Sequence, residues 1–258
     1  MLGFLIVFPL VIAAILLAVR NNAARNVVVV AASLVIGLAS IWLVAVGLNG
    51  ASPVYFEFSS PIVDGICTIV GIVVAITVIC FGAKYKNPLA IVLAVVQLIG
   101  SLVFELNFAH GIEVATPLYY DQLTLLMVFI IGVIGSAICV YALGYMEDFQ
   151  AHEPEGAKDR RPVFFALMFL FLSAMFIIVT SDNMDWLVAG WEITTVCSFL
   201  MIGYTRTLEA RKSAILQINL NMIGGLAFHI ALVYMHVVGV PLSINGMVEV
   251  AGGAQAAQ

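Results

Sequence analysis

The chain has 258 residues, of which 63% are hydrophobic and only 10% are charged, and its formal net charge is −5. An ordinary water-soluble domain is about half apolar and about a quarter charged. This composition therefore excludes a soluble globular protein and predicts a chain that is largely surrounded by lipid. The modest negative charge gives no indication of nucleic-acid binding.

Eight apolar stretches are long enough to cross a bilayer, which takes about 20 helical residues. In chain order they are 3–19, 27–48, 62–83, 88–108, 122–146, 162–180, 185–204 and 213–238. The first begins without a basic segment and lacks a convincing cleavage site, so we expect a spanning helix and not a removed signal peptide. The predicted fold class is an all-α polytopic membrane protein with eight transmembrane helices.

The positions of the basic residues test this count independently. All ten lie in four connections: Arg20 and Arg25; Lys84 and Lys86; Lys158, Arg160 and Arg161; Arg206, Arg211 and Lys212. The alternate connections, and the tail after residue 238, contain no Lys or Arg. Because cytoplasmic connections are enriched in basic residues, this alternation predicts that both termini lie outside.

The predicted spans divide the chain into three regions. Residues 1–118 hold four transmembrane helices, two of which form an extra hairpin at 62–108 with a very short connection. Residues 119–238 hold the other four. Residues 239–258 end in GGAQAAQ, a composition typical of a flexible tail, which we expect on the outer side.

Carboxylates inside the predicted spans are the first candidates for function, because a charge at mid-membrane costs at least ~2.5 kcal/mol. Only Glu192 and Glu105 lie well inside a span. Glu192 lies in AGWEITTVCSF, beside Trp191 and hydroxyl residues that can hold water. It is a candidate proton-holding group whose charge a moving cation could control. The alternative is a structural glutamate that bonds a neighbouring helix.

Four further residues are weaker candidates. Glu105 lies near the outer end of its span. Asp121 and Asp182 lie at span ends, where helix capping or an interfacial contact explains them. Lys212 starts the last span, where anchoring at the cytoplasmic surface is sufficient; a transport role would require it to reach inward toward Glu192.

The last span carries a stripe of polar residues. Gln217 and Asn221 are four residues apart and share one helix face, which could hold water or could bond neighbouring helices together. His229 lies two turns beyond Asn221. Histidine titrates near neutral pH, which suits a proton relay, but a hydrogen-bonded core histidine is equally consistent with the pattern.

Other kinds of site have no support in the sequence. The four cysteines, Cys67, Cys80, Cys139 and Cys197, lie in apolar runs without ligand spacing and are interpreted as packing residues. We find no cofactor motif, metal-ligand cluster or soluble catalytic domain. We therefore expect no catalytic residue, no metal and no cofactor in this chain.

Four segments, in order across residues 119–204, resemble the amino-terminal half of the antiporter-like membrane subunits. They are YYDQLTLLMVFIIGVIG, VYALGYM, FFALMFLFLSAMFIIVTSDN and LVAGWEITTVCSFLMIGY. That family includes the largest antiporter-like subunit of respiratory complex I, subunits of energy-converting hydrogenases, and Mrp-type Na+/H+ antiporters. The GWE motif with its following Cys-Ser and Gly-Tyr is the most specific piece.

The resemblance implies roles for three residues. Glu192 corresponds to the essential membrane carboxylate of an ion half-channel, and Asp121 of the YYD motif and Asp182 of the SDN motif correspond to structural or gating residues. From their positions in the spans alone, Glu105, His229 and Lys212 are the further candidates for the ion pathway, and Trp191 and Asn221 are further structural or gating candidates. The redox centres that drive such pumps lie in other subunits.

This chain departs from the family pattern in three ways. Family members are longer, and their next helices supply an intramembrane lysine that pairs with the glutamate; this chain ends before it. The 62–108 hairpin resembles an insertion. The last span reads NLNMIGG where complex I relatives often have an Asn-Arg…Gly-Asp pattern, which favours hydrogenase-type or Mrp-type relatives.

We therefore expect a partial antiporter-like module of a redox-driven proton or sodium pump in a prokaryotic inner membrane. It would be a non-catalytic ion-translocating subunit of a larger oxidoreductase, of the NADH:quinone oxidoreductase or membrane hydrogenase type. Its partners would be lipid and other membrane subunits, including a chain that supplies the missing lysine. The alternatives are a structural membrane anchor and a subunit of a non-redox transporter, either an Mrp antiporter or an inorganic-carbon uptake system.

Overall fold

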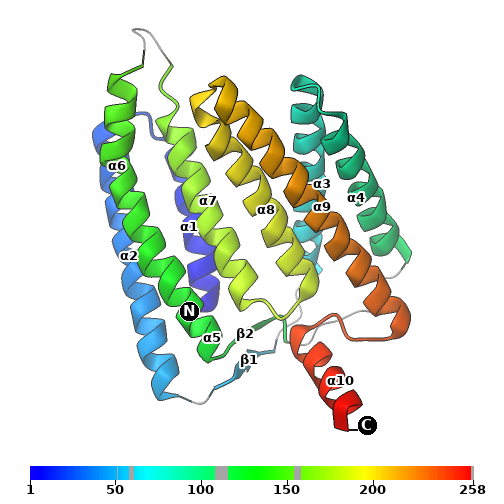
Figure 1. Ribbon diagram of the computed structural model, residues 1–258. Coiled ribbons are helices and arrows are strands. Elements are labelled where there is room, and N and C mark those ends of the chain that lie inside the picture. The colour runs from blue at the N-terminus through cyan, green and yellow to red at the C-terminus, as the bar shows by residue number, and fades with distance from the viewer. Residues whose placement is uncertain (51, 58–60, 108–115, 154–157, 257–258) are drawn as a thin grey trace. The chain divides into compact units, whose positions relative to one another are not determined.

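The computed structural model describes residues 1–50, 52–57, 61–107, 116–153 and 158–256. Its helices begin and end within five residues of the eight predicted spans (Figure 1). Six helices are long and apolar enough to cross a membrane. Two apolar segments are shorter, namely α1 (Leu2–Ala18) and residues Pro88–Val103 of α4 (Pro88–Asn107). The chain is therefore a helical, multi-pass membrane protein.

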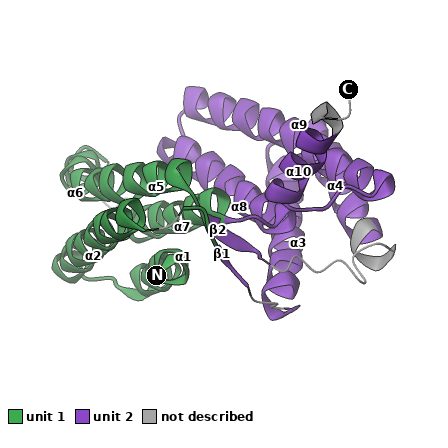
Figure 2. Ribbon diagram, turned by 90° about the horizontal axis from the view of Figure 1, so that it is seen from below, with its two compact units in different colours: residues 1–54, 120–180 green, residues 55–119, 181–258 purple. Residues whose placement is uncertain are grey.

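The helices form two compact units, which Figure 2 colours separately. Unit 1 comprises residues 1–54 and 120–180, and unit 2 comprises residues 55–119 and 181–258. Each unit is thus built from two separate stretches of chain. The predicted 62–108 hairpin belongs to the same unit as the helix that carries GWE.

Unit 1 consists of long helices, one of which is interrupted. Its elements are α1, α2 (Asn22–Asn49), α5 (Gln122–Phe129), the π-helical segment η1 (Ile130–Ile134), α6 (Gly135–Ala151) and α7 (Arg161–Thr180). Helix α1 packs along α7, and the Ser173 hydroxyl donates to the Ile6 carbonyl at 2.7 Å. Helix α2 packs against α5, η1 and α6.

A glycine permits the close approach of η1 to α2. A Cβ atom at Gly132 would overlap the Oγ and Cβ atoms of the fully buried Ser40. Small residues at a helix crossing let two backbones approach closely, which is a common basis of helix packing in membranes.

A buried arginine joins the start of α2 to the start of α7. Arg25 is only 2% exposed; its guanidinium lies 5.7 Å from the Phe165 ring centroid and 3.7 Å from Asp159 Oδ2. Asp159 also accepts hydrogen bonds from Arg161 Nε at 2.9 Å and Nη2 at 3.0 Å. One carboxylate thus connects two arginines at this end of unit 1.

Acidification is expected to weaken this connection. The hydrogen bonds from Arg161, and then the charges of Arg161 and Arg25, hold the pKa of Asp159 below its ordinary value of 3.8. A lowered folded-state pKa means that the ionised form stabilises the fold above about pH 3.8, and that this contribution disappears as the pH falls through the folded value. Because Asp159 is a third exposed, we expect Asp159→Asn to cost about 1 kcal/mol at neutral pH, or about 2–4 °C in melting temperature.

Thermal unfolding in detergent, followed from neutral pH to below pH 3.8, checks this expectation. The difference between wild type and Asp159→Asn should narrow on acidification. Asp148→Asn is the matched control, because Asp148 is 79% exposed and is expected to have no effect. A constant difference across the pH range would contradict the assignment.

Unit 2 is a closed packing of four helices with short elements at its ends. Its elements are α3 (Pro61–Lys84), α4, α8 (Met184–Ile202), the 3-10 turn η2 (Gly203–Thr205), α9 (Leu208–Val238) and α10 (Ile244–Ala256). It also holds two of the three residues of each short strand, β1 (Val54–Phe56) and β2 (Leu118–Tyr120). Helix α3 packs on α4 and α8, and α9 packs on the same two helices, so the four enclose a common interior. Strands β1 and β2 pair with each other, a short sheet that the helical pattern did not predict.

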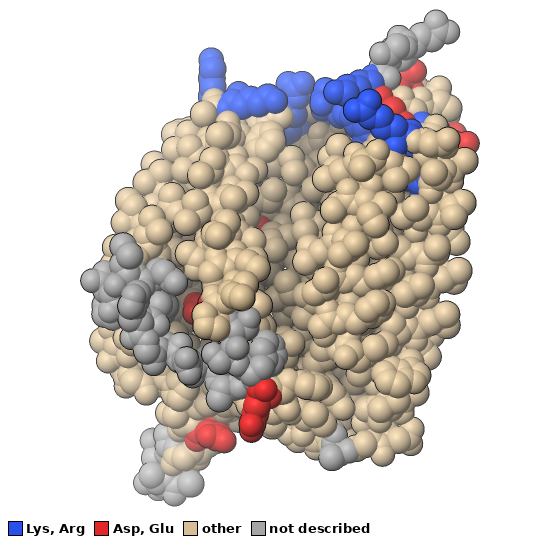
Figure 3. All heavy atoms as spheres, turned by 180° about the vertical axis from the view of Figure 1, so that it is seen from behind, with Lys and Arg blue, Asp and Glu red and all other residues tan. Residues whose placement is uncertain are grey.

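Within each unit the Lys and Arg side chains gather at one end, drawn blue in Figure 3. In unit 2 they lie at or just after the end of α3 (Lys84 and Lys86) and around the start of α9 (Arg206, Arg211 and Lys212). In unit 1 they lie between α1 and the first turn of α2, and between α6 and the first residue of α7.

The carboxyl-terminal segment forms helix α10, where composition predicted a weakly structured tail. Asp182, only 1% exposed, explains the difference: its Oδ1 accepts hydrogen bonds from the backbone N of Asn245 at 3.0 Å and from its Nδ2 at 2.8 Å. Tyr55 donates to the Oδ1 of the same asparagine at 3.1 Å. These contacts join residues that are far apart in the sequence, so local composition carries no sign of them.

Removing the Asp182 carboxylate should release α10. Two hydrogen bonds to a charged acceptor are lost in Asp182→Ala, and a cost of about 2 kcal/mol corresponds to roughly 30-fold faster amide exchange in residues 244–256. Asp182→Asn keeps an acceptor oxygen and should have a smaller effect. Hydrogen–deuterium exchange measures both variants, and unchanged exchange in α10 for Asp182→Ala would show that other contacts hold the helix.

Candidate functional site

Glu192 lies near the middle of α8 and faces the interior of unit 2. Its side chain is almost fully buried, at 5% residue exposure, whereas the neighbouring Trp191 is 41% exposed. Asn183 caps the start of α8 by accepting a hydrogen bond from the backbone N of Asp185 at 2.9 Å. The cap fixes where α8 begins. The helical repeat then places Glu192 on the face of α8 that is turned toward α3, α4 and α9.

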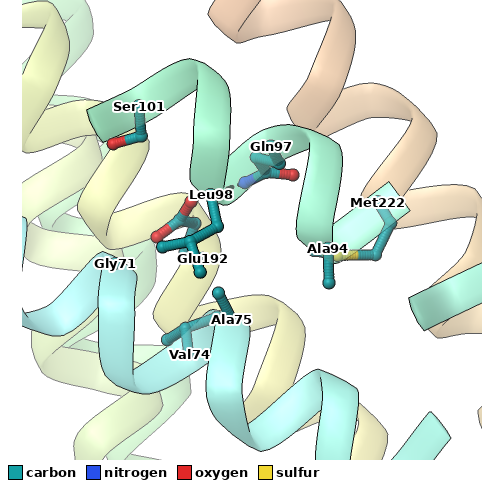
Figure 4. Close-up of a pocket in the computed structure, with 9 residues that line it drawn as sticks. All are labelled: Gly71, Val74, Ala75, Ala94, Gln97, Leu98, Ser101, Glu192 and Met222. Atoms are coloured by element: carbon teal, nitrogen blue, oxygen red, sulfur yellow. Dashed lines mark hydrogen bonds between the residues drawn. The ribbon is translucent and has the colours of Figure 1, made fainter. Parts of the chain in front are cut away.

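The direct partner of Glu192 is Gln97 on α4. Gln97 Nε2 donates to Glu192 Oε1 at 2.5 Å, and Gln97 is also 5% exposed (Figure 4). Gln97 is not among the residues predicted from the sequence. Gln97 is the one polar side chain within the apolar run AIVLAVVQLIG, and this could have drawn attention to it. Nothing in the run identifies which helix Gln97 faces.

His229 on α9 faces the same carboxyl oxygen, Glu192 Oε1, at a longer distance. Its Nε2 is 3.9 Å from Glu192 Oε1, which is within ion-pair range but too long for a hydrogen bond. Its Nδ1 lies 2.8 Å from the carbonyl oxygen of Gly225. Since a carbonyl can only accept, Nδ1 carries a proton, and Nε2 is the nitrogen that faces Glu192.

A small cavity adjoins the carboxyl group and has room for about one water molecule. The residues that line it come from all four helices: Gly71, Val74, Ala75, Ala94, Gln97, Leu98, Ser101, Glu192 and Met222 (Figure 4). Glycines provide the space. Glu192 Oε2 lies 3.1 Å from where a Cβ at Gly71 would be, and Gln97 Oε1 lies 3.0 Å from the equivalent point at Gly225.

The polar stripe of α9 bonds that helix to α8. Gln217 Nε2 donates to the Thr195 carbonyl at 3.4 Å, and Asn221 Nδ2 donates to the Thr195 hydroxyl at 3.3 Å. The Thr195 hydroxyl in turn donates to the Trp191 carbonyl at 3.0 Å. The interhelical bonding that the sequence left open as one alternative for Gln217 and Asn221 is therefore present.

Lys212, Asp121 and Asp182 are not among the residues that line the cavity. Lys212 is exposed in the first turns of α9, beside Arg211, and does not line the cavity. Asp121 accepts from the backbone N of Thr124 at 2.7 Å and so caps α5 in unit 1. Asp182 holds α10. Glu105 lies in α4, but its side chain falls outside the described part of the structure.

Two further observations limit the chemistry of the described residues. Among them, no three His, Cys, Asp or Glu side chains are grouped to hold a metal ion. No Lys or Arg is among the residues that line the cavity. Within the described part of unit 2, the groups placed to interact with the Glu192 carboxyl are thus an amide and an imidazole.

Comparison with known proteins relates this chain to membrane subunits of respiratory and antiporter complexes. Residues 106–155 match the family model described as the N-terminus of NADH-ubiquinone oxidoreductase (complex I) chain 5. The chain is 35% identical over 144 residues to NADH-ubiquinone oxidoreductase chain 5 of Dictyostelium citrinum, a match that covers 54% of this chain and 19% of the relative. Over these segments the chain is similar to antiporter-like membrane subunits.

Two bacterial proteins extend this relationship. NADH-quinone oxidoreductase subunit L of Mycobacterium tuberculosis is 40% identical over 96 residues, which is 37% of this chain and 14% of the relative. A Staphylococcus aureus protein named as antiporter subunit mnhA2 is 28% identical over 185 residues, which is 67% of this chain and 22% of the relative. The chain thus matches no more than about a fifth of the length of these antiporter-like subunits.

Proposed function

We propose that this chain is an ion-translocating membrane subunit, in which the Glu192 carboxyl takes up and releases a proton during turnover. The observation that carries the proposal is a carboxyl group buried among four helices, hydrogen-bonded to Gln97 and 3.9 Å from a histidine nitrogen. A carboxyl group is rarely retained at such a position without a function. The relationship to complex I chain 5, subunit L and an antiporter subunit supports the same conclusion.

The proposed topology has eight transmembrane helices with both termini outside, in a prokaryotic inner membrane. In support, six long apolar helices and two shorter ones coincide with the eight predicted spans. The Lys and Arg side chains gather at one end within each unit, which we assign to the cytoplasmic side. The bacterial relatives favour a prokaryotic membrane.

The chain is proposed to act with other membrane subunits, one of which brings a lysine or another cation toward Glu192. All Lys and Arg residues of this chain lie in or next to connections between helices. A cation that approached the buried carboxylate would stabilise its charged form and favour proton release, and its retreat would favour uptake. His229, whose Nε2 lies 3.9 Å from Glu192 Oε1, would then exchange the proton with that oxygen.

The energy source is proposed to be a redox reaction in partner subunits, of the complex I or energy-converting hydrogenase type. Two of the relatives described above are oxidoreductase subunits, and the third is an antiporter subunit. The antiporter relative favours an Mrp-type assembly as the second candidate. Glu192 would serve the same purpose in either assembly.

Purification from the native membrane in mild detergent tests the proposal. Subunits that co-purify identify the assembly, and reconstitution into vesicles shows whether an electron donor or an imposed Na+ gradient drives proton movement. Proton movement that depends on an electron donor supports the redox pump, and movement that depends only on Na+ supports the antiporter. A chain that purifies alone and moves no ions would support the structural anchor.

A further inference from the structure

Gln97 presents a feature that the proposed function does not explain. Its Nε2 donates to Glu192, but its Oε1 is buried and has no hydrogen-bond partner among the described residues. A buried polar atom without a partner costs about 1–3 kcal/mol, so its presence requires a reason. A hydrophobic residue of similar size would avoid this cost.

We infer that Gln97 is the positioning residue of the Glu192 carboxyl, and that rotation of its amide keeps the pair hydrogen-bonded in both charge states of Glu192. This inference rests on the proposed function, because it assumes that Glu192 changes its charge. Through Gln97 on α4, the hairpin α3–α4 thereby contributes a positioning residue to the site.

The hydrogen-bonding capacities of the two groups support this role. An ionised carboxylate only accepts, and the Nε2 donor now faces it. A protonated carboxyl group carries an O–H donor and therefore needs an acceptor. Rotation of the amide by half a turn exchanges Nε2 for Oε1, which then accepts from that O–H. No covalent bond changes except the O–H bond that the arriving proton forms on Glu192.

The absence of a side chain at Gly225 gives the Gln97 amide room to rotate. The rotation takes place about the Cγ–Cδ bond, and Gln97 Oε1 lies on the side of Gly225, where a Cβ would be only 3.0 Å away. The adjoining cavity has room for about one water molecule, which can take the hydrogen bond of the displaced amide nitrogen.

Few other groups can take over this role. Besides Gln97, the described residues that reach the carboxyl or line the cavity are small or aliphatic residues of α3 and α4, Ser101 of α4, and Met222 and His229 of α9. His229 Nε2 is 3.9 Å away and is the only titratable neighbour among them. Gln97 is therefore the group in direct hydrogen-bond contact.

Infrared difference spectroscopy of the purified assembly tests the inference through the C=O stretch of protonated Glu192. The band is assigned by its loss in Glu192→Gln. In Gln97→Met, which keeps the side-chain length but cannot hydrogen-bond, we expect the band to shift to higher wavenumber. Glutamine isotope labelling should in addition show an amide band that changes on protonation in the wild type and is lost in this variant.

Gln217→Met is the matched control. Gln217 also has a buried Oε1 without a hydrogen-bond partner among the described residues, but its amide bonds Thr195 instead of Glu192. It should leave the Glu192 band in place. If Gln97→Met does not assemble, Gln97→Asn, whose amide is too short to keep the contact, should give the same shift. A band at the wild-type position in the Gln97 variant overturns the inference alone, whereas the absence of any Glu192 band overturns the proposed proton-holding role.

Discussion

Glu192→Gln is expected to reduce ion translocation by at least roughly 100-fold, within the range by which proton-transferring side chains contribute to rates. Glutamine has nearly the same size and shape, and its carbonyl oxygen can still accept the hydrogen bond from Gln97 Nε2 that is 2.5 Å long in the wild type. It can neither bind nor release a proton near neutral pH. The variant should therefore assemble normally and fail only in translocation, as measured with a pH-sensitive dye in reconstituted vesicles.

The glutamine variant separates function from structure better than an alanine variant does. Glu192→Ala would leave a cavity and deprive the buried Gln97 of its partner, so a loss of activity could follow from loss of packing. Glu209→Gln provides the control, since Glu209 is exposed in the first turn of α9 in the same unit. Full translocation by an assembled Glu192→Gln protein would support a structural role for this helix.

Gly132→Ala is expected to destabilise unit 1 by roughly 1–3 kcal/mol, the usual cost of overpacking a tight interface, and Gly132→Leu to prevent folding. The added Cβ would overlap the Oγ and Cβ of Ser40. A rotamer change could move the Ser40 oxygen, but its Cβ moves only with the backbone of α2. The two helices would therefore have to separate.

Thermal unfolding in detergent, followed by size-exclusion chromatography, measures this effect. Gly144→Ala is the matched control in α6, because a Cβ at Gly144 meets no atom within 4 Å. The double variant Gly132→Ala with Ser40→Gly should recover most of the lost stability. Equal melting temperatures for Gly132→Ala and Gly144→Ala would contradict the close approach.

Most of the helical fold could be predicted from the sequence, because in a membrane each span must be long, apolar and internally hydrogen-bonded. The hairpin over 62–108 and the long last helix are examples, and their observed limits lie close to the expected ones. The features that were not predicted depend on contacts distant in sequence. Helix α10 is held by Asp182, and the β1–β2 pairing joins segments on either side of the hairpin.

The candidate site was predictable in part for a related reason. Glu192 stands out because a charged group inside a span is costly, whereas an uncharged glutamine such as Gln97 is a much weaker signal. Which helices adjoin α8 cannot be read from hydrophobicity, so the sequence could identify the carboxyl group without its partner. For His229 the pattern left two interpretations open, and the structure places its ring 3.9 Å from the carboxyl oxygen.

The pairing of α1 with α7 has a consequence for how the protein is made. Ser173 and Ile6, which join the two helices, are 167 residues apart. At roughly 5–20 residues per second, the ribosome needs about 8–33 s to deliver the second partner after the first. During that interval α1 must reside in the membrane without its partner. Its segment LGFLIVFPLVIAAILLA contains no charged side chain, so lipid can surround it on every side until α7 is inserted.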